Sequence, residues 1–287
     1  MIVPTRNRPD QFSDFAKSLY ENSEHPNNIE LIALLDDDDK SYANIFNKLP
    51  RVKWIIGKRE WLGPITTKGI KNSNGDIIFL CNDDVIVLTK KWDTKVRRAH
   101  GKYVDKVYLA GPNDMNQGSN LFVFPIFSRS VFNALNRYTS YYSGAYIDTH
   151  IFEIFSSLKH FGFDRFEFLE NVSFKHNHFS VTGSKPDQTY LDRKKSCEDE
   201  KFFSLVGDRL QSAENLRKLI NSNENVFTYR PGIVSAFTGF KIYLNGYYLP
   251  RKQGAKICLQ FIARTLIRIL IRGKSLCSSG SSASSSV

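Results

Sequence analysis

Gly75-Asp-Ile-Ile-Phe-Leu-Cys-Asn-Asp-Asp84 carries the clearest structural signal in the chain. The apolar run from Ile77 to Cys81 is too short for a typical helix and favours a strand that is buried on both faces. The run stops abruptly at Asn82-Asp-Asp84. Open α/β sheets bind their ligands beyond the carboxyl ends of their strands, so the two carboxylates are placed where a ligand would lie.

The same pattern recurs toward the N-terminus. The apolar run from Ile29 to Leu35 ends at the acidic run Asp36-Asp-Asp-Asp39, and Met1 to Pro4 runs into a polar loop. Strand-like runs that alternate with helix-like segments indicate an α/β fold, with a mostly parallel central sheet flanked by helices. The remaining predicted elements of this region are a strand at Val52 to Ile56 and helices at Phe12 to Leu19 and Ile65 to Asn74.

Composition and charge narrow the class of protein. The chain has 287 residues, of which 41% are hydrophobic and 24% charged, as in ordinary globular proteins. Four scattered cysteines give no disulfide framework, which favours a reducing compartment. The N-terminus lacks the pattern of a secretory signal, so we expect a cytoplasmic protein.

The net charge of +11 is concentrated in the C-terminal segment. Residues 230–287 contain nine Lys/Arg and no Asp or Glu, which leaves 31 basic against 29 acidic residues in the rest. We therefore expect a catalytic domain at 1–229, a basic aromatic and amphipathic extension at 230–277, and a Ser-rich disordered tail at 278–287.

Residues 254–272 of this extension predict a helix, because basic or amide side chains recur at every fourth position among apolar ones. Arginines near its middle argue against a membrane span. The pattern favours a helix that lies on an anionic membrane surface, and the alternative is a helix that packs on the catalytic domain or on a partner.

Several polar residues are candidates for chemistry. Asp83 and Asp84 could hold a divalent cation or form a solvated turn. Asp148 begins a predicted helix, where it is either a general base or a helix-capping acid. His176 and His178 alternate on a strand-like segment, so we expect them to point to opposite faces, with at most one of them binding a metal.

The order of these motifs resembles the family 2 type of GT-A glycosyltransferases. Val3-Pro-Thr-Arg-Asn-Arg-Pro-Asp10 is similar to that family's first strand and base-binding loop, and Leu35-Asp-Asp37 to its second acidic motif. The segment from Gly75 to Asp84 is similar to the strand that leads into its DxD metal motif, here written Asn-Asp-Asp. Ile147-Asp148 before a helix, followed by a strand into His176, resembles its base-bearing helix and downstream histidine.

The resemblance covers about residues 1–215 and implies a GT-A-like, Rossmann-like fold and a reaction. It implies that a sugar moves from a nucleotide-sugar donor, most often a UDP-sugar, to the hydroxyl of a glycan or lipid-linked acceptor with inversion. Asp148 would be the catalytic base, and Mn²⁺ or Mg²⁺ would be held by Asp84, Asp83 and one of the two histidines, His176 or His178. The implied donor-binding residues are Pro4, Thr5, Arg6, Arg8, Asp36, Asp37, Lys68 and Asp83.

Two other functions remain open from the sequence. A nucleotidyltransferase would share the sheet and the metal carboxylates, but no Gly-rich phosphate loop with Lys or Arg follows the first strand. A nucleic-acid-binding protein could use the aromatic and basic C-terminal extension. The nearly neutral remainder of the chain argues against it, so we expect no nucleic-acid partner.

Overall fold

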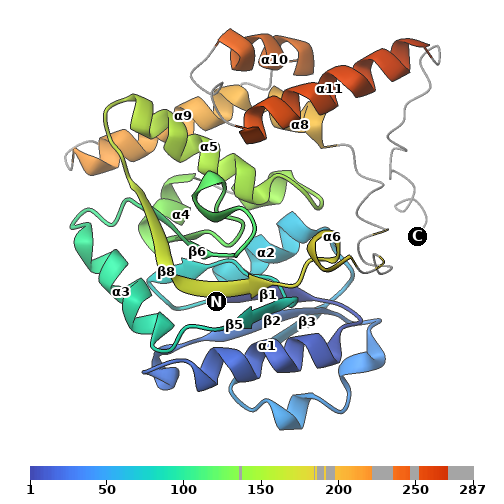
Figure 1. Cartoon of the computed structure of the whole chain (residues 1–287), viewed down its shortest axis with the longest axis vertical. Coiled ribbons are helices and arrows are strands. Elements are labelled where there is room, and N and C mark those ends of the chain that lie inside the picture. The colour runs from blue at the N-terminus through green and yellow to red at the C-terminus, as the bar shows by residue number, and fades with distance from the viewer. Residues whose placement is uncertain are drawn as a thin grey trace, which may run out of the picture.

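Three parallel strands form the N-terminal sheet of the computed structural model, in the order β1 (Ile2–Thr5), β2 (Leu31–Asp36) and β3 (Val52–Gly57). The structure describes residues 1–135, 138–183, 185, 191, 198–221, 235–245 and 252–270. Figure 1 shows these strands in the lower half of the molecule, with α1 (Pro9–Glu21) covering one face. The predicted alternation of strands and helices in this region is confirmed.

A second, mixed sheet continues from the first. Its strand order is β4-β7-β6-β8-β5, and a parallel bridge between Ile2 and Leu80 joins its first strand to β1. β6 and β8 are parallel, whereas β7 is antiparallel to both β4 and β6 because no crossover helix separates β6 from β7. The bounds are β4 (Ile77–Phe79), β5 (Val85–Val87), β6 (Leu109–Asn113), β7 (Ile126–Ser128) and β8 (Phe166–His176).

The strand β2 is buried on both faces, as its apolar run predicts. In β2, Ile32 and Leu34 pack in the cluster that holds α5 (Ile147–His160), while Leu31 and Ala33 pack in the cluster that holds α1. The helix α2 (Leu62–Lys71) lies especially close to the sheet. A Cβ atom on its Gly69 would lie 2.7 Å from Ile2 Cγ2, so this approach requires a residue without a side chain.

The helices α5, α8, α9, α10 and α11 gather at the end of the molecule remote from α1 (Figure 1). α10 and α11 pack against α8 around a shared cluster that includes Phe203, Phe240 and Phe261. None of the helices in the described ranges has the length and apolar character needed to cross a membrane. The bounds not yet given are α3 (Trp92–Lys102), α4 (Arg129–Leu135), α6 (Phe179–Thr182), α8 (Asp199–Ser204), α9 (Val206–Ile220), α10 (Ala236–Asn245) and α11 (Lys252–Leu270).

Two of the expected segments extend into residues outside this description. The predicted extension at 230–277 is described only in part, at 235–245 and 252–270, where it contains α10 and α11. The predicted Ser-rich tail at 278–287 lies wholly outside the described residues.

Candidate active site

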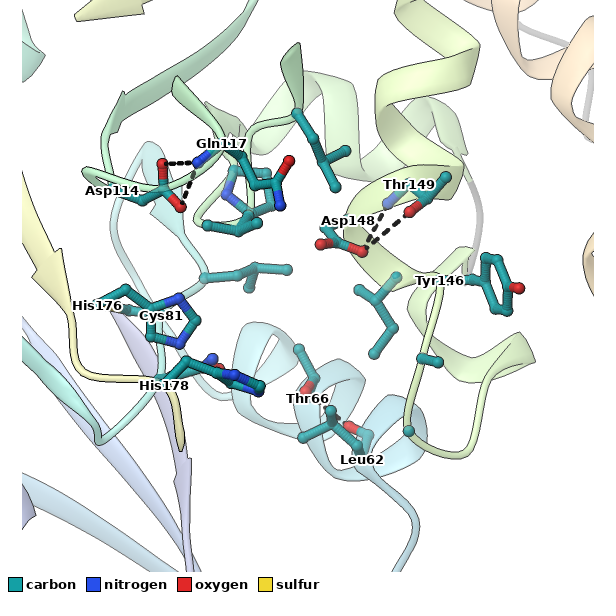
Figure 2. Close-up of a pocket in the computed structure, with 18 of the residues that line it drawn as sticks. Leu62, Thr66, Cys81, Asp114, Gln117, Tyr146, Asp148, Thr149, His176 and His178 are labelled. Carbon is teal, nitrogen blue, oxygen red and sulfur yellow. Dashed lines mark hydrogen bonds between the residues drawn. The ribbon is translucent and has the colours of Figure 1, made fainter. Parts of the chain in front are cut away.

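A pocket of about 530 Å³ opens beyond the ends of β1 and β4. Its walls come from distant parts of the sequence, including Pro4 on β1, Asn82 after β4, the loop that follows β6, the start of α5 and one side of α11. Figure 2 shows Asp148 on one side of the pocket, and His176 and His178 on the other.

Asp148 lies in the first turn of α5 and is half-buried. One of its carboxylate oxygens, Oδ1, accepts hydrogen bonds from the backbone N–H and the hydroxyl of Thr149, at 2.7 and 3.3 Å (Figure 2). Burial raises the pKa of Asp148, and the bonds from Thr149 partly oppose that rise. A carboxylate with a raised pKa in a pocket is a stronger base than an exposed one, as general-base catalysis requires.

The loop that leads into Asp148 is held from two sides. On one side, the carboxylate of Glu198 accepts hydrogen bonds from the backbone N–H groups of Ser143, Gly144 (2.9 Å) and Ala145 (2.6 Å). It also accepts a hydrogen bond from the Ser143 hydroxyl (2.7 Å). On the other side, the Ser143 carbonyl oxygen accepts the backbone N–H of Leu62, at the start of α2. Glu198 was not among the residues predicted from the sequence.

The expectation that His176 and His178 point to opposite faces is wrong. Strand β8 ends at His176, so the alternation of side chains does not continue to His178. Both residues line the pocket, and their ring centroids are 5.3 Å apart. The Nε2 atom of His176 lies 3.3 Å from Oδ1 of the buried Asp84.

Both carboxylate oxygens of Asp83 accept hydrogen bonds from other side chains. Its Oδ1 accepts a hydrogen bond from Nη1 of the buried Arg8 at 2.8 Å, and its Oδ2 accepts one from the Thr5 hydroxyl at 2.7 Å. Burial raises the pKa of Asp83, and the Arg8 guanidinium acts against that rise. Tyr42 also hydrogen-bonds to Thr5. Asp83 therefore ties β1 and its following loop to the end of β4, whereas Asp84 is the carboxylate that meets a histidine.

The residues around Asp84 fit a divalent cation in part. Within the described ranges, no three His, Cys, Asp or Glu side chains form a ready cluster of metal ligands. Mg²⁺ commonly takes one or two protein carboxylates and completes its coordination with water and substrate phosphate. A carboxylate beside His176, with His178 in the same pocket, supplies a donor set of that kind.

The residues predicted to bind the nucleotide lie at the ends of β1 to β3. Nη1 of Arg6 contacts Asp36 at 2.8 Å, and the same guanidinium pairs with Asp38, at 2.9 Å from Nη2. Asp37, which was also predicted to contact the donor, is exposed at the same edge. Lys68 lies near the end of β3, with its Nζ 3.8 Å from Glu60.

Two more parts of the pocket wall were missed or misjudged from the sequence. In the loop after β6, the carboxylate of Asp114 accepts hydrogen bonds from the backbone N–H groups of Asn116, Gln117 and Gly118. This cap presents Gln117 to the pocket (Figure 2). On another wall, Ile257, Gln260 and Arg264 of α11 line the same pocket, although the sequence placed them in a separate extension.

Comparisons with known proteins identify the family. The family described as Glycosyl transferase family 2 matches residues 1–180. No curated protein sequence matches the chain. Similar solved structures include TarS from S. aureus, at 12% identity and a TM-score of 0.45, with 76% of this chain and 50% of that chain covered. This chain thus spans about half the length of TarS.

Two further structures have similar scores. The mannosyltransferase PcManGT from Pyrobaculum calidifontis, solved with GDP-Man and Mn²⁺, is 11% identical with a TM-score of 0.42, over 95% of this chain and 87% of that one. A mycobacterial protein is 11% identical with a TM-score of 0.47, over 74% and 73%. The family match spans well over half of the chain and agrees with the mixed α/β sheet. The chain therefore belongs to glycosyltransferase family 2 and has the GT-A type of α/β fold.

Proposed function

We propose that this glycosyltransferase moves a sugar from a nucleotide-sugar donor to an acceptor hydroxyl, with inversion and with the help of a divalent cation. The observation that carries the proposal is the arrangement of the pocket. Asp148 lies across it from His176 and His178, and the carboxyl ends of β1 and β4 contribute to its wall (Figure 2). A base and a site for the leaving diphosphate on opposite sides of one pocket suit an in-line displacement.

Asp148 is the proposed catalytic base. Its raised pKa suits removal of a proton from the acceptor hydroxyl as that oxygen attacks the anomeric carbon. Glu198 and Thr149 keep the carboxylate in place, because they fix the loop before it and one of its oxygens. Sugar specificity is proposed to involve Gln117, which Asp114 holds at the pocket wall.

The donor nucleotide is proposed to lie along the ends of β1 and β2. Arg6, Asp36 and Asp38 form a charged group there, and Pro4 joins that group to the pocket. Thr5, Arg8 and Asp83 hold the backbone of this region in position. Asp37 and Lys68 remain proposed donor contacts, and a UDP-sugar is the first donor to try.

Asp84 and His176, with His178 nearby, are the residues that would hold Mn²⁺ or Mg²⁺. A cation bound there would neutralise charge on the leaving nucleoside diphosphate. Asp84 is buried and the His176 side chain is only 10% exposed, so they offer a fixed rather than a flexible donor set.

The acceptor is proposed to be a glycan or lipid-linked hydroxyl, used in polysaccharide or glycolipid assembly. We place the enzyme in the cytoplasm, peripheral on the cytoplasmic face of a membrane. The basic extension supports this location, because residues 230–287 contain no acidic residue.

A screen of nucleotide sugars with Mn²⁺, with Mg²⁺ and with a chelator tests the reaction. We expect metal-dependent release of a nucleoside diphosphate, and an inverted anomeric configuration in the product by NMR. Release of pyrophosphate from a sugar phosphate and a nucleoside triphosphate would identify a nucleotidyltransferase instead. Full activity with the chelator would remove the metal from the proposal.

A further inference from the structure

The helix α11 has three distinct sides. Its inner side, with Ile257, Cys258 and Phe261, is buried against α8 and α10. Phe261 lies 4.7 Å from Phe203 and 4.9 Å from Phe240, measured between ring centroids. This packing confirms that α11 lies on the body of the protein, one of the two arrangements expected from the sequence.

The second side of α11 faces the pocket through Gln260 and Arg264. Nη1 of Arg264 contacts Oδ1 of Asp199 at 2.6 Å, and the Asp199 side chain is fully buried. An unpaired buried carboxylate is costly, so this contact holds α11 at a fixed rotation. The orientation of the third side is fixed by the same contact.

The third side of α11 is apolar and exposed. Leu259 is 67% exposed, Ile262 41% and Leu266 55%. Their spacing of three and four residues places them in one stripe along the helix. At 100° per residue, this stripe lies roughly 130° from the buried side and roughly 150° from the pocket side. Solvent-exposed helix faces of soluble domains are normally polar, so an apolar stripe indicates an interaction surface.

The charge of the extension identifies the kind of surface. Residues 230–287 contain nine Lys/Arg and no acidic residue, so a second copy of the same extension would be repelled. An apolar stripe within a purely basic segment suits the interface of an anionic bilayer, where apolar groups enter the acyl boundary and cations meet headgroups. We propose that Leu259, Ile262 and Leu266 dock α11 on an anionic lipid surface.

The proposed docking also indicates the class of acceptor, and this part of the inference rests on the proposed function. The helix that meets the lipid also lines the pocket through Gln260 and Arg264, so the pocket is held next to the membrane surface. An acceptor anchored in the same bilayer would reach Asp148 without leaving it. The acceptor class is therefore inferred to be lipid-linked rather than a free soluble glycan.

Sedimentation of the full chain with vesicles tests the docking without any donor or acceptor. The vesicles are phosphatidylcholine alone, or phosphatidylcholine with about one third phosphatidylglycerol. We expect binding to the anionic vesicles only, and about tenfold or greater loss of binding in the triple variant L259S/I262S/L266S. The control variant Val104→Ser removes an apolar side chain that is 95% exposed on a different part of the fold, and it should bind as the wild type does.

Three results would overturn the docking proposal. They are an absence of vesicle binding, equal binding by the triple variant, or a dimer in the absence of lipid that only the triple variant abolishes. If the triple variant does not fold, the single variant Leu266→Ser replaces it. Because the assay contains no nucleotide sugar, failure of the reaction proposed above would leave this result unaffected, and the converse also holds.

Discussion

Replacing Asp83 with Asn tests whether its role differs from the metal-binding role proposed for Asp84. Asp83 and Arg8 form a pair at 2.8 Å with side chains only 4% and 6% exposed. Removing one partner of a buried pair typically costs about 3–5 kcal/mol, because the remaining charge is left uncompensated. Asn keeps one acceptor oxygen for Thr5 or Arg8, so we expect about 3 kcal/mol, roughly a 150-fold loss in the folding equilibrium constant.

Urea unfolding, followed by tryptophan fluorescence, measures this loss. Asp84→Asn is the matched variant, since it changes the neighbouring carboxylate beside His176. We expect Asp84→Asn to abolish Mn²⁺ binding in calorimetry with a much smaller change in stability. The reasoning is refuted if Asp83→Asn unfolds like the wild type and loses Mn²⁺ binding instead. A double variant with Arg8→Met should be less destabilised than the sum of the two single variants.

Three further predictions concern α5 and its surroundings. Asp148→Asn should lower kcat by about 10²–10⁴-fold with little change in donor affinity. Because burial raises the pKa of Asp148, the activity of the wild type should fall as the pH drops through that raised value. This fall at acid pH should be absent from the pH–rate profile of the variant. Glu198→Gln should lower kcat by roughly 10–100-fold while the Kd for the donor is unchanged. Hydrogen exchange of the backbone amides at residues 143–145 should become faster, because Glu198 accepts hydrogen bonds from them. Unchanged exchange would exclude the role of Glu198 in positioning this loop. Burial lowers the pKa of His150 to about 4, so below about pH 6.5 the unfolded chain binds a proton at this residue that the folded chain does not bind. The free energy of unfolding should therefore be highest above pH 6.5 and fall by about 1.4 kcal/mol per pH unit toward pH 4. Urea titrations of His150→Gln should show a weaker dependence of that free energy on pH.

Much of the fold follows from local patterns in the sequence. The apolar runs of β1, β2 and β4 and the periodic helices between them are properties of neighbouring residues, so short windows of sequence are enough to predict them. The acidic groups at Asp36 and Asp83 follow from the rule that ligands bind at the carboxyl edge. At that edge the structure brings Arg6 to 2.8 Å from Asp36, two residues 30 positions apart in the chain.

The roles of individual side chains depend on where an element ends and on which partners meet it. His178 joins His176 in the pocket because β8 stops at His176, and strand ends are the least certain feature of a sequence pattern. Asp83 and Asp84 are adjacent and chemically identical. Only the positions of Arg8, Thr5 and His176 show that Asp83 is bonded to Arg8 and Thr5 whereas Asp84 faces a histidine.

The contribution of the C-terminal segment to the pocket has no local signal at all. The sequence pattern places Gln260 and Arg264 on the polar stripe of an amphipathic helix, and none of the residues next to them in the sequence indicates a contact with the pocket. Their role arises because the inner side of α11 is complementary to α8, and because Asp199 is buried where only Arg264 pairs with it among the contacts described. A basic helix can therefore be both a wall of the pocket and a surface for a membrane, since its sides are too far apart around the axis to compete for the same partner.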